Sequence, residues 1–139
     1  MFQHILIPVD FSEKNEQALQ VAVEIAIHHH SKISLLHVIE AIADTSFEEV
    51  HNFYLGLEER AQKKMDGLLA NYLKSAINFE ERIVYGNRTQ QIIDFSETQA
   101  IDLIVMSSHR VDPDDPTLDW GTISYKVGIL APCPILLVK

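Results

Sequence analysis

Residues His4-Ile5-Leu6-Ile7-Pro8-Val9-Asp10 decide the fold class. The run from Ile5 to Val9 is apolar without alternation, which is typical of a short strand that is covered on both faces. A turn at residues 10–13 follows, where Asp10 and Glu13 have the spacing of a capping box. After it, small and aliphatic residues recur at helical spacing as far as about residue 30. The first thirty residues therefore predict a strand, a tight turn and a helix.

The same alternation continues through the remaining sequence. A second buried strand is expected over 33–38, a more polar third strand over 79–85, and further strands over 102–106 and 134–138. Helices are expected over 50–72, around 92–95 and over 120–130. Thr45 with Glu48, or Ser46 with Glu49, could cap the long second helix. Strands that alternate with helices imply a parallel sheet with helices on both faces. We therefore predict an α/β fold, an open five-stranded parallel sheet in a single domain spanning residues 1–139.

Composition narrows the possible partners. Eleven basic and twenty acidic residues give a net charge of −9, which argues against a nucleic-acid binder or a protein held on anionic lipid. The longest apolar stretch, residues 129–138, is interrupted by two prolines and is too short to span a bilayer. The single cysteine, Cys133, fits a reducing compartment, so a cytoplasmic location is expected.

Several motifs in register resemble the universal stress protein family. They are residues 4–12, Leu35-Leu36-His37-Val38, Gly86 with Ile92-Ile93, residues 102–109, Gly121-Thr122 and residues 131–138. The resemblance covers the whole chain. It implies a Rossmann-like sheet of the adenine nucleotide alpha hydrolase type, a cytoplasmic location, and a homodimer formed by pairing of the last strand, residues 135–138.

Family members that bind ATP carry a loop of pattern G-x2-G-x9-G-[S/T] between the fourth strand and the fourth helix. Glycines let backbone amides approach phosphate oxygens, and the helix N-terminus favours an anion. By position, Ser107 and Arg110 replace the first two glycines, whereas Gly121 and Thr122 are retained. Ten residues instead of nine precede Gly121, and the loop is acidic, with aspartates at 112, 114, 115 and 119.

Residues 108–112, Ser-His-Arg-x-Asp, resemble a branch of the family in which nucleotide binding survives loss of these glycines. Two interpretations of Arg110 remain open. Its guanidinium could donate a pair of charge-assisted hydrogen bonds to a phosphate, or it could simply neutralise the negative charge of the nearby aspartates.

The resemblance also assigns residues at the ends of the first two strands. Asp10 lies where the family places an acid near the adenosine, although helix capping is an alternative role. Val38 matches the position whose backbone meets adenine, and it is also expected in the core. Pro8 either shapes the pocket floor or only ends a strand.

Two functions follow. The first is a stress-response module that binds ATP, with Mg²⁺ to screen the acidic loop, through Pro8, Asp10, Val38, Ser107, Arg110, Gly121 and Thr122. The alternative is a nucleotide-free dimeric interaction or protective protein. No catalytic residue is assigned, and slow ATP hydrolysis is a third option without an assignable base. The three histidines at 28–30 point about 100° apart on a helix and are not predicted to share a metal.

Overall fold

The computed structural model describes residues 1–40, 47–108, 114 and 122–139, with residues 47–49 described by their backbone alone. Strands and helices alternate along the chain. The elements are β1 (His4–Pro8), α1 (Lys14–His29), β2 (Lys32–Ile39), α2 (Phe47–Leu69), a 3₁₀ turn (Ala70–Tyr72), β3 (Phe79–Tyr85), α3 (Arg88–Thr98), β4 (Leu103–Ser107), α4 (Ile123–Leu130) and β5 (Ile135–Val138).

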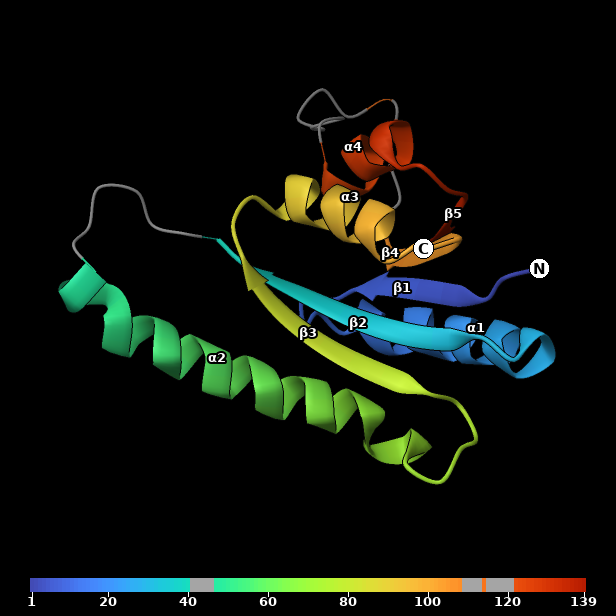
Figure 1. Cartoon of the computed structure of the whole chain (residues 1–139), viewed down its shortest axis with the longest axis horizontal. Helices are drawn as coiled ribbons and strands as arrows, with labels where there is room; N and C mark the ends of the chain where they lie inside the picture. The colour runs from blue at the N-terminus through green and yellow to red at the C-terminus, as the bar shows by residue number, and fades with distance from the viewer. Residues whose placement is uncertain (41–46, 109–113, 115–121) are drawn as a thin grey trace.

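The strands form one parallel sheet in the order β3-β2-β1-β4-β5, as Figure 1 shows. The predicted open five-stranded parallel sheet is thus confirmed. The chain starts at the centre of the sheet, builds outward to β3, and then returns so that Leu103 pairs with Ile5. The strand order therefore reverses between β1 and β4, and ligands of open α/β sheets bind at the carboxyl ends of strands at such a point.

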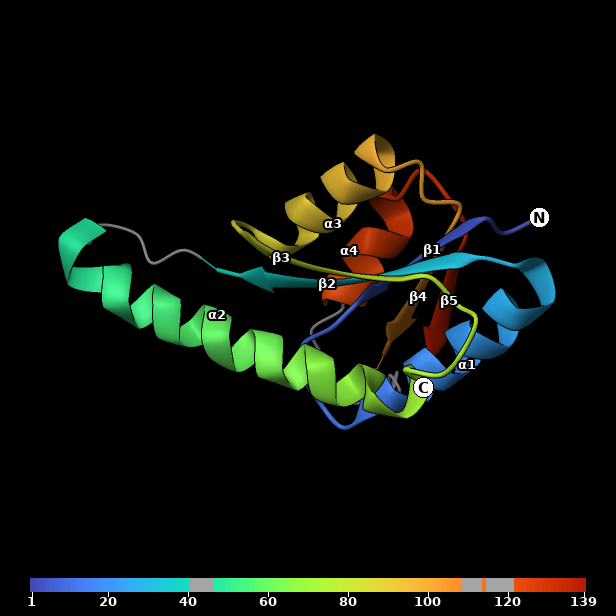
Figure 2. The ribbon, with the colours of Figure 1, turned by 60° about the horizontal axis from the view of Figure 1, so that its bottom comes forward.

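Helices cover both faces of the sheet, and each face has its own core. On one face, α1 and α2 pack on Ile5, Ile7, Ile33 and Leu35. On the other face, α3 and α4 pack on residues that alternate with these, including Leu6, Leu36, Val38 and Met106. Figure 2 shows the two helix layers on either side of the strands. The continuous apolar runs of the sequence therefore arise because successive strand residues enter opposite cores.

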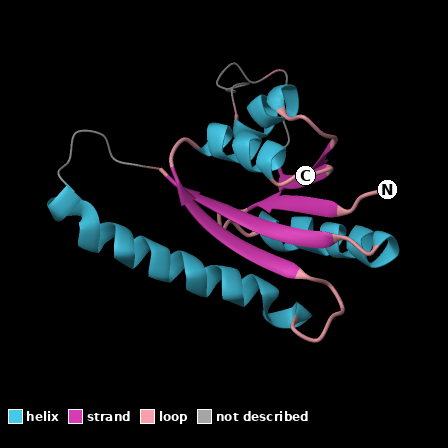
Figure 3. Cartoon of the chain, viewed as in Figure 1, coloured by secondary structure: helices cyan, strands magenta, loops and turns pink. Residues whose placement is uncertain are grey.

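Helix α2 is longer than the strands beside it. Its carboxyl half buries Ala61, Met65 and Leu69 against the sheet, whereas Phe53 and Leu55 in its amino half are exposed. In Figures 1 and 3 this amino half extends beyond the carboxyl ends of β2 and β3. The capping pairs predicted for this helix involve side chains outside the described residues.

Two local predictions need correction. Residues 10 and 13 do not form a capping box, because Glu13 is the N-cap of α1 and makes no side-chain cap hydrogen bond within the described chain. Asp10 instead accepts a hydrogen bond from the Ser12 amide, at 2.9 Å, and so closes a turn before the helix. The last helix begins at Ile123 rather than at residue 120, which lies outside the described residues.

Candidate functional site

A buried asparagine organises the carboxyl end of β1. The Oδ1 atom of Asn15 accepts hydrogen bonds from the amides of Asp10, at 3.0 Å, and Phe11, at 2.8 Å. Its Nδ2 donates to the Ser107 hydroxyl at the end of β4, at 3.1 Å. Asn15 is only 1% exposed. One side chain therefore ties the loop after β1 to the end of β4 across the point where the strand order reverses.

Phe11 takes a conformation that few side chains adopt. Its φ is +65°, in the left-handed region, where a residue with a Cβ is strained. The hydrogen bond from its amide to Asn15 and the contact of its ring with His37, 4.4 Å between centroids, hold it there. The loop is therefore fixed at both its backbone and its side chain.

The Asp10 carboxylate is set beside this loop and is exposed. Partial burial of the carboxyl opposes ionisation, but hydrogen bonds from Ser12 and the neighbouring Asn15 outweigh it and lower the pKa of Asp10. Asp10 is therefore a fully ionised acceptor at neutral pH, suited to receive hydroxyl donors from a ligand.

Hydroxyl groups gather where β4 ends and α4 begins. The Ser108 and Ser124 oxygens lie 3.2 Å apart, and Ser124 lies at the same distance from the Thr122 hydroxyl. Thr122 is the N-cap of α4 and accepts from the Tyr125 amide at 3.4 Å. The start of α4 is thereby fixed against the end of β4, with its first amides at the carboxyl edge of the sheet.

Two lysines reach the same edge. Lys14, at the start of α1, donates to the Ser108 carbonyl at 3.3 Å. Lys139, after β5, lies 3.5 Å from the Ser108 hydroxyl. Both ammonium groups therefore lie beside Ser108 at the end of β4, close to the amino terminus of α4, which favours an anion.

The predicted site residues divide into three groups. Asp10 and Ser107 are brought together by Asn15, and Thr122 joins them through the serine hydroxyls. Pro8 ends β1, and Val38 is 4% exposed with its side chain in the core, so its backbone alone faces the edge of the sheet. Arg110 and Gly121 lie outside the described residues.

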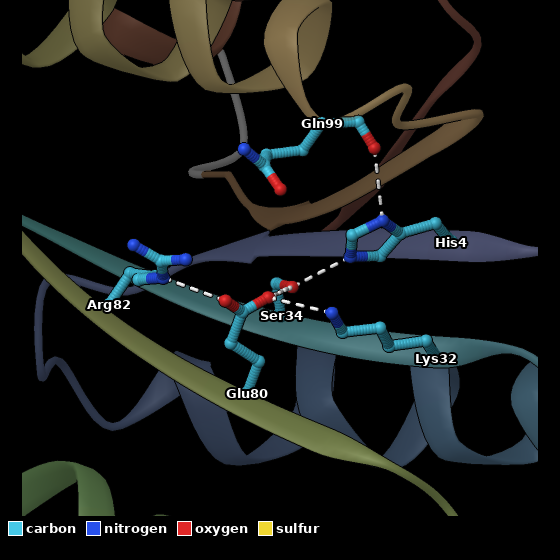
Figure 4. A network of polar contacts seen from close by, with 6 residues as sticks. All are labelled: His4, Lys32, Ser34, Glu80, Arg82 and Gln99. Carbon is cyan, nitrogen blue, oxygen red and sulfur yellow. Dashed lines mark hydrogen bonds and ion pairs between the residues drawn. The ribbon is translucent and has the colours of Figure 1, made fainter.

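A second polar network lies at the amino end of the sheet, as Figure 4 shows. Glu80 accepts from Arg82 at 2.7 Å and from Lys32 at 3.0 Å. The buried Ser34 hydroxyl lies 3.0 Å from Glu80 and 2.7 Å from Nε2 of His4, whose Nδ1 contacts the Gln99 carbonyl. Hydrogen bonds from Arg82, Lys32 and Ser34 outweigh partial burial and lower the pKa of Glu80 to about 2.

Comparison with known proteins identifies the family. The model of the universal stress protein family matches residues 1–139. The chain belongs to the universal stress protein family. A family member from Thermus aquaticus is 30% identical over the full length of both chains. Universal stress protein MJ0577 of Methanocaldococcus jannaschii is 29% identical, and the match covers 100% of this chain and 96% of that protein.

Solved structures of family members share the fold. The MJ0577 structure superposes with a TM-score of 0.83 over 100% of this chain and 96% of that one. The universal stress protein of Archaeoglobus fulgidus in complex with dAMP has a TM-score of 0.72 at 18% identity, and the match covers 99% of this chain and 98% of that one. These likenesses confirm the Rossmann-like architecture that the family resemblance implied.

Asn15, Lys14, Lys139 and Ser124 were missed by the sequence analysis. Asn15 stands inside an amphipathic helix pattern, where an asparagine ordinarily marks the solvent side. The signal that could have found it is its position, because it falls on the same helix face as Ala18, Leu19 and Ala22. Lys14 and Lys139 carry no motif, and only the assembled sheet brings them to Ser108.

Proposed function

We propose that this universal stress protein binds an adenine nucleotide, ATP with Mg²⁺, at the carboxyl ends of β1, β2 and β4. The observation that carries the proposal is the Asn15 side chain, which holds the Asp10 loop and Ser107 together at the point of strand-order reversal. The complex of a structural neighbour with dAMP supports an adenine ligand.

The phosphates would lie at the start of α4. The amides that follow the Thr122 cap and the positive end of the helix favour an anion there. Lys14 and Lys139 approach Ser108 beside it and replace part of what the two missing glycines supply in other members. Arg110 and Gly121 are assigned to the same phosphates by their place in the family loop.

The adenosine would lie on the other side of Ser107. An ionised Asp10 accepts the ribose hydroxyls, and the backbone of Val38 meets the adenine edge. Pro8, at the end of β1, would form the floor of this pocket. The four aspartates between residues 112 and 119 repel a triphosphate, and Mg²⁺ would screen them.

Calorimetric titration with ATP tests the proposal. Binding is expected to be tighter with Mg²⁺ than without it. Arg110→Ala should weaken binding by about 1.5–3 kcal/mol, as loss of a hydrogen bond to a charged group does. Lys74→Ala, an exposed change near the opposite end of the sheet, should leave affinity unchanged. Gly121→Val should abolish binding, because a side chain at this position would keep the phosphates away from the backbone amides. If millimolar ATP with Mg²⁺ gives no heat, the nucleotide assignment is wrong.

The second candidate is a dimeric interaction protein that needs no nucleotide, and exposed apolar residues near β5 favour self-association. β5 is an edge of the sheet, and Leu136 on it is 38% exposed. Tyr125, Ile129 and Leu130 on α4 are also exposed. An unprotected apolar edge strand is a pairing site. Sedimentation tests this: Leu136→Lys should shift the protein toward monomer, because Leu136 points away from the core that Leu137 fills.

We infer that both candidates act by binding in the cytoplasm. The one cysteine, Cys133, is free, in keeping with a reducing compartment. No helix in the described parts of the chain has the length and hydrophobicity to cross a membrane. Measuring phosphate release with excess ATP tests the absence of catalysis, and a turnover that Asp10→Asn abolishes would assign an ATPase activity instead.

A further inference from the structure

A concave region lies between α2 and the carboxyl end of β2. It is a pocket of about 270 Å³, lined by Phe11, His37, Leu57, Arg60, Lys64 and Arg88 among others. His37 points to the face that carries α1 and α2, because its neighbours Leu36 and Val38 enter the opposite core. Apart from the backbone around Val38, the pocket is therefore separate from the site at β4 and α4.

Three cations converge on this pocket from two elements. Arg60 and Lys64 lie one helical turn apart on α2, and Arg88 begins α3. Within the described residues, none of the three makes an ion pair with a carboxylate. One acid, Glu40, also lines the pocket, so the lining carries a net charge of about +2. This local charge is opposite in sign to that of the whole chain.

The floor of the pocket is aromatic and rigid. The Phe11 and His37 rings lie 4.4 Å apart, and the Lys64 ammonium lies 5.4 Å from the Phe11 centroid. Nδ1 of His37 is 2.8 Å from the Val9 carbonyl and must donate to it, since a carbonyl only accepts. Nε2 has no hydrogen-bond partner among the described residues. The strained Phe11 backbone, held by Asn15, keeps this floor in place.

The His37 side chain is suited to act as a neutral hydrogen-bond acceptor. Burial, together with the nearby Arg88 and Lys64 charges, lowers the pKa of His37, against the opposing effects of its bond to Val9 and of Asp10. The ring is therefore neutral at pH 7, with Nε2 able to accept from a ligand. Cations at the rim and a flat, partly apolar floor are complementary to an anionic group attached to a ring.

We propose that this pocket binds a small organic phosphate whose phosphate group is attached to a planar ring, independently of the nucleotide proposed at β4 and α4. The ring lies on Phe11 and against Leu57, and the phosphate is held by Arg60, Lys64 and Arg88. The volume of about 270 Å³ lies just below the usual range of ligand sites and favours a single ring over a nucleoside triphosphate.

Phenyl phosphate is the probe, with phenol and inorganic phosphate as its two halves. We expect phenyl phosphate to bind in the millimolar range or tighter, each half to bind at least tenfold more weakly, and affinity to fall with added salt. The NMR signals of the His37 ring should shift on titration, and those of His4, at the other end of the sheet, should not. Equal binding of inorganic phosphate, or no binding at 10 mM phenyl phosphate, would overturn the proposal.

Variants on α2 and α3 with a matched control on α2 locate the site. Lys64→Gln and Arg88→Gln should each weaken phenyl phosphate roughly tenfold, the usual effect of losing one charge-assisted hydrogen bond. Lys63→Gln removes the same charge from the adjacent residue, which does not line the pocket, and should have no effect. An equal loss in Lys63→Gln would mean general electrostatic attraction and would refute the site. All three residues carry exposed or half-buried side chains, so thermal melts should confirm an intact fold.

Competition with ATP separates this site from the proposed nucleotide site. Phenyl phosphate should bind equally well in the presence of saturating ATP, and Lys64→Gln should leave ATP affinity unchanged. If ATP displaces the probe and Lys64→Gln weakens both to the same extent, the pocket belongs to the nucleotide site and the inference is wrong. If ATP does not bind at all, the nucleotide proposal fails while the phenyl phosphate result still decides the pocket.

Discussion

The two polar networks at opposite ends of the sheet fix different parts of the chain. At the amino end, Glu80 links side chains of β2 and β3 to one another, and its two cationic partners are on the same sheet. At the carboxyl end, Asn15 holds backbone amides and a serine, and Lys14 meets a carbonyl. The first network joins strands that are already paired, whereas the second fixes loops that no strand pairing holds.

This difference suggests that the amino-end network stabilises the fold, whereas the carboxyl-end network serves ligand binding. Charges that neutralise one another, as around Glu80, leave little for a ligand to bind. The cations around Ser108 lie beside the start of α4, where an anion is favoured. We therefore expect changes at the amino end to alter only stability and changes among the lysines at the carboxyl end to alter only binding. Asn15 should be the exception that affects both.

The largest effect is expected for Asn15→Ala. Two loop amides and the Ser107 hydroxyl lose their partner, and leaving buried polar groups unsatisfied costs about 1–3 kcal/mol. Urea unfolding measures this loss, and ATP titration should show a parallel loss of affinity. Asn52→Ala, at an exposed position of α2, is the control and should cost less than 0.5 kcal/mol by the usual range for surface substitutions. A comparable loss in both variants would remove Asn15 from the organisation of the site.

A smaller effect is expected for Glu80→Gln. Because the pKa of Glu80 is lowered to about 2 in the folded protein, its ion pairs stabilise the fold above the unfolded pKa and are lost as the pH falls from 4.5 toward 2. Since Arg82 and Lys32 are partly exposed, solvent screening reduces the contribution to about 1 kcal/mol.

Stability measured against pH tests this prediction. The wild type should lose stability across that acidic interval more steeply than Glu80→Gln, and ATP affinity at pH 7 should be the same in both. Identical acid profiles would show that the pairs around Glu80 contribute nothing. A fall in ATP affinity would break the separation between the two ends.

The sequence predicts those features of the fold and of the candidate site whose signal lies within a short stretch of chain. The strands and the order of elements follow from apolar runs and helical spacing, so the parallel sheet could be predicted and was confirmed. The assignment of Asp10 to a capping box was wrong because an aspartate before a helix can accept either from the amide two residues on, as in an Asx turn, or from the amide three residues on, as in a cap. The hydrogen bond from the Ser12 amide decided between them. Lys14 and Lys139 could not be found, because Lys14 reaches Ser108 only through the packing of α1 against β4 and Lys139 only through the pairing of β5 with β4.

The smallest effect is expected for Lys14→Gln. Removing one partly screened charge beside Ser108 should weaken ATP binding by about 0.5–1 kcal/mol and leave the unfolding free energy almost unchanged. Lys74→Gln is the charge-matched control and should alter neither quantity. If Lys14→Gln destabilises the fold as much as Asn15→Ala does, the lysine is structural, and the phosphates are not beside it.

The strand order has a consequence for the nascent chain on the ribosome. β1 is made first yet lies in the middle of the sheet, and its second neighbour, β4, emerges only when most of the chain has been synthesised. The half built from β1, β2 and β3 can assemble early, but one side of β1 then presents unpaired backbone groups. Such an edge invites pairing with other chains until residues 103 and 104 cover it. Slowing translation after β3 should therefore increase aggregation more than slowing it before β2.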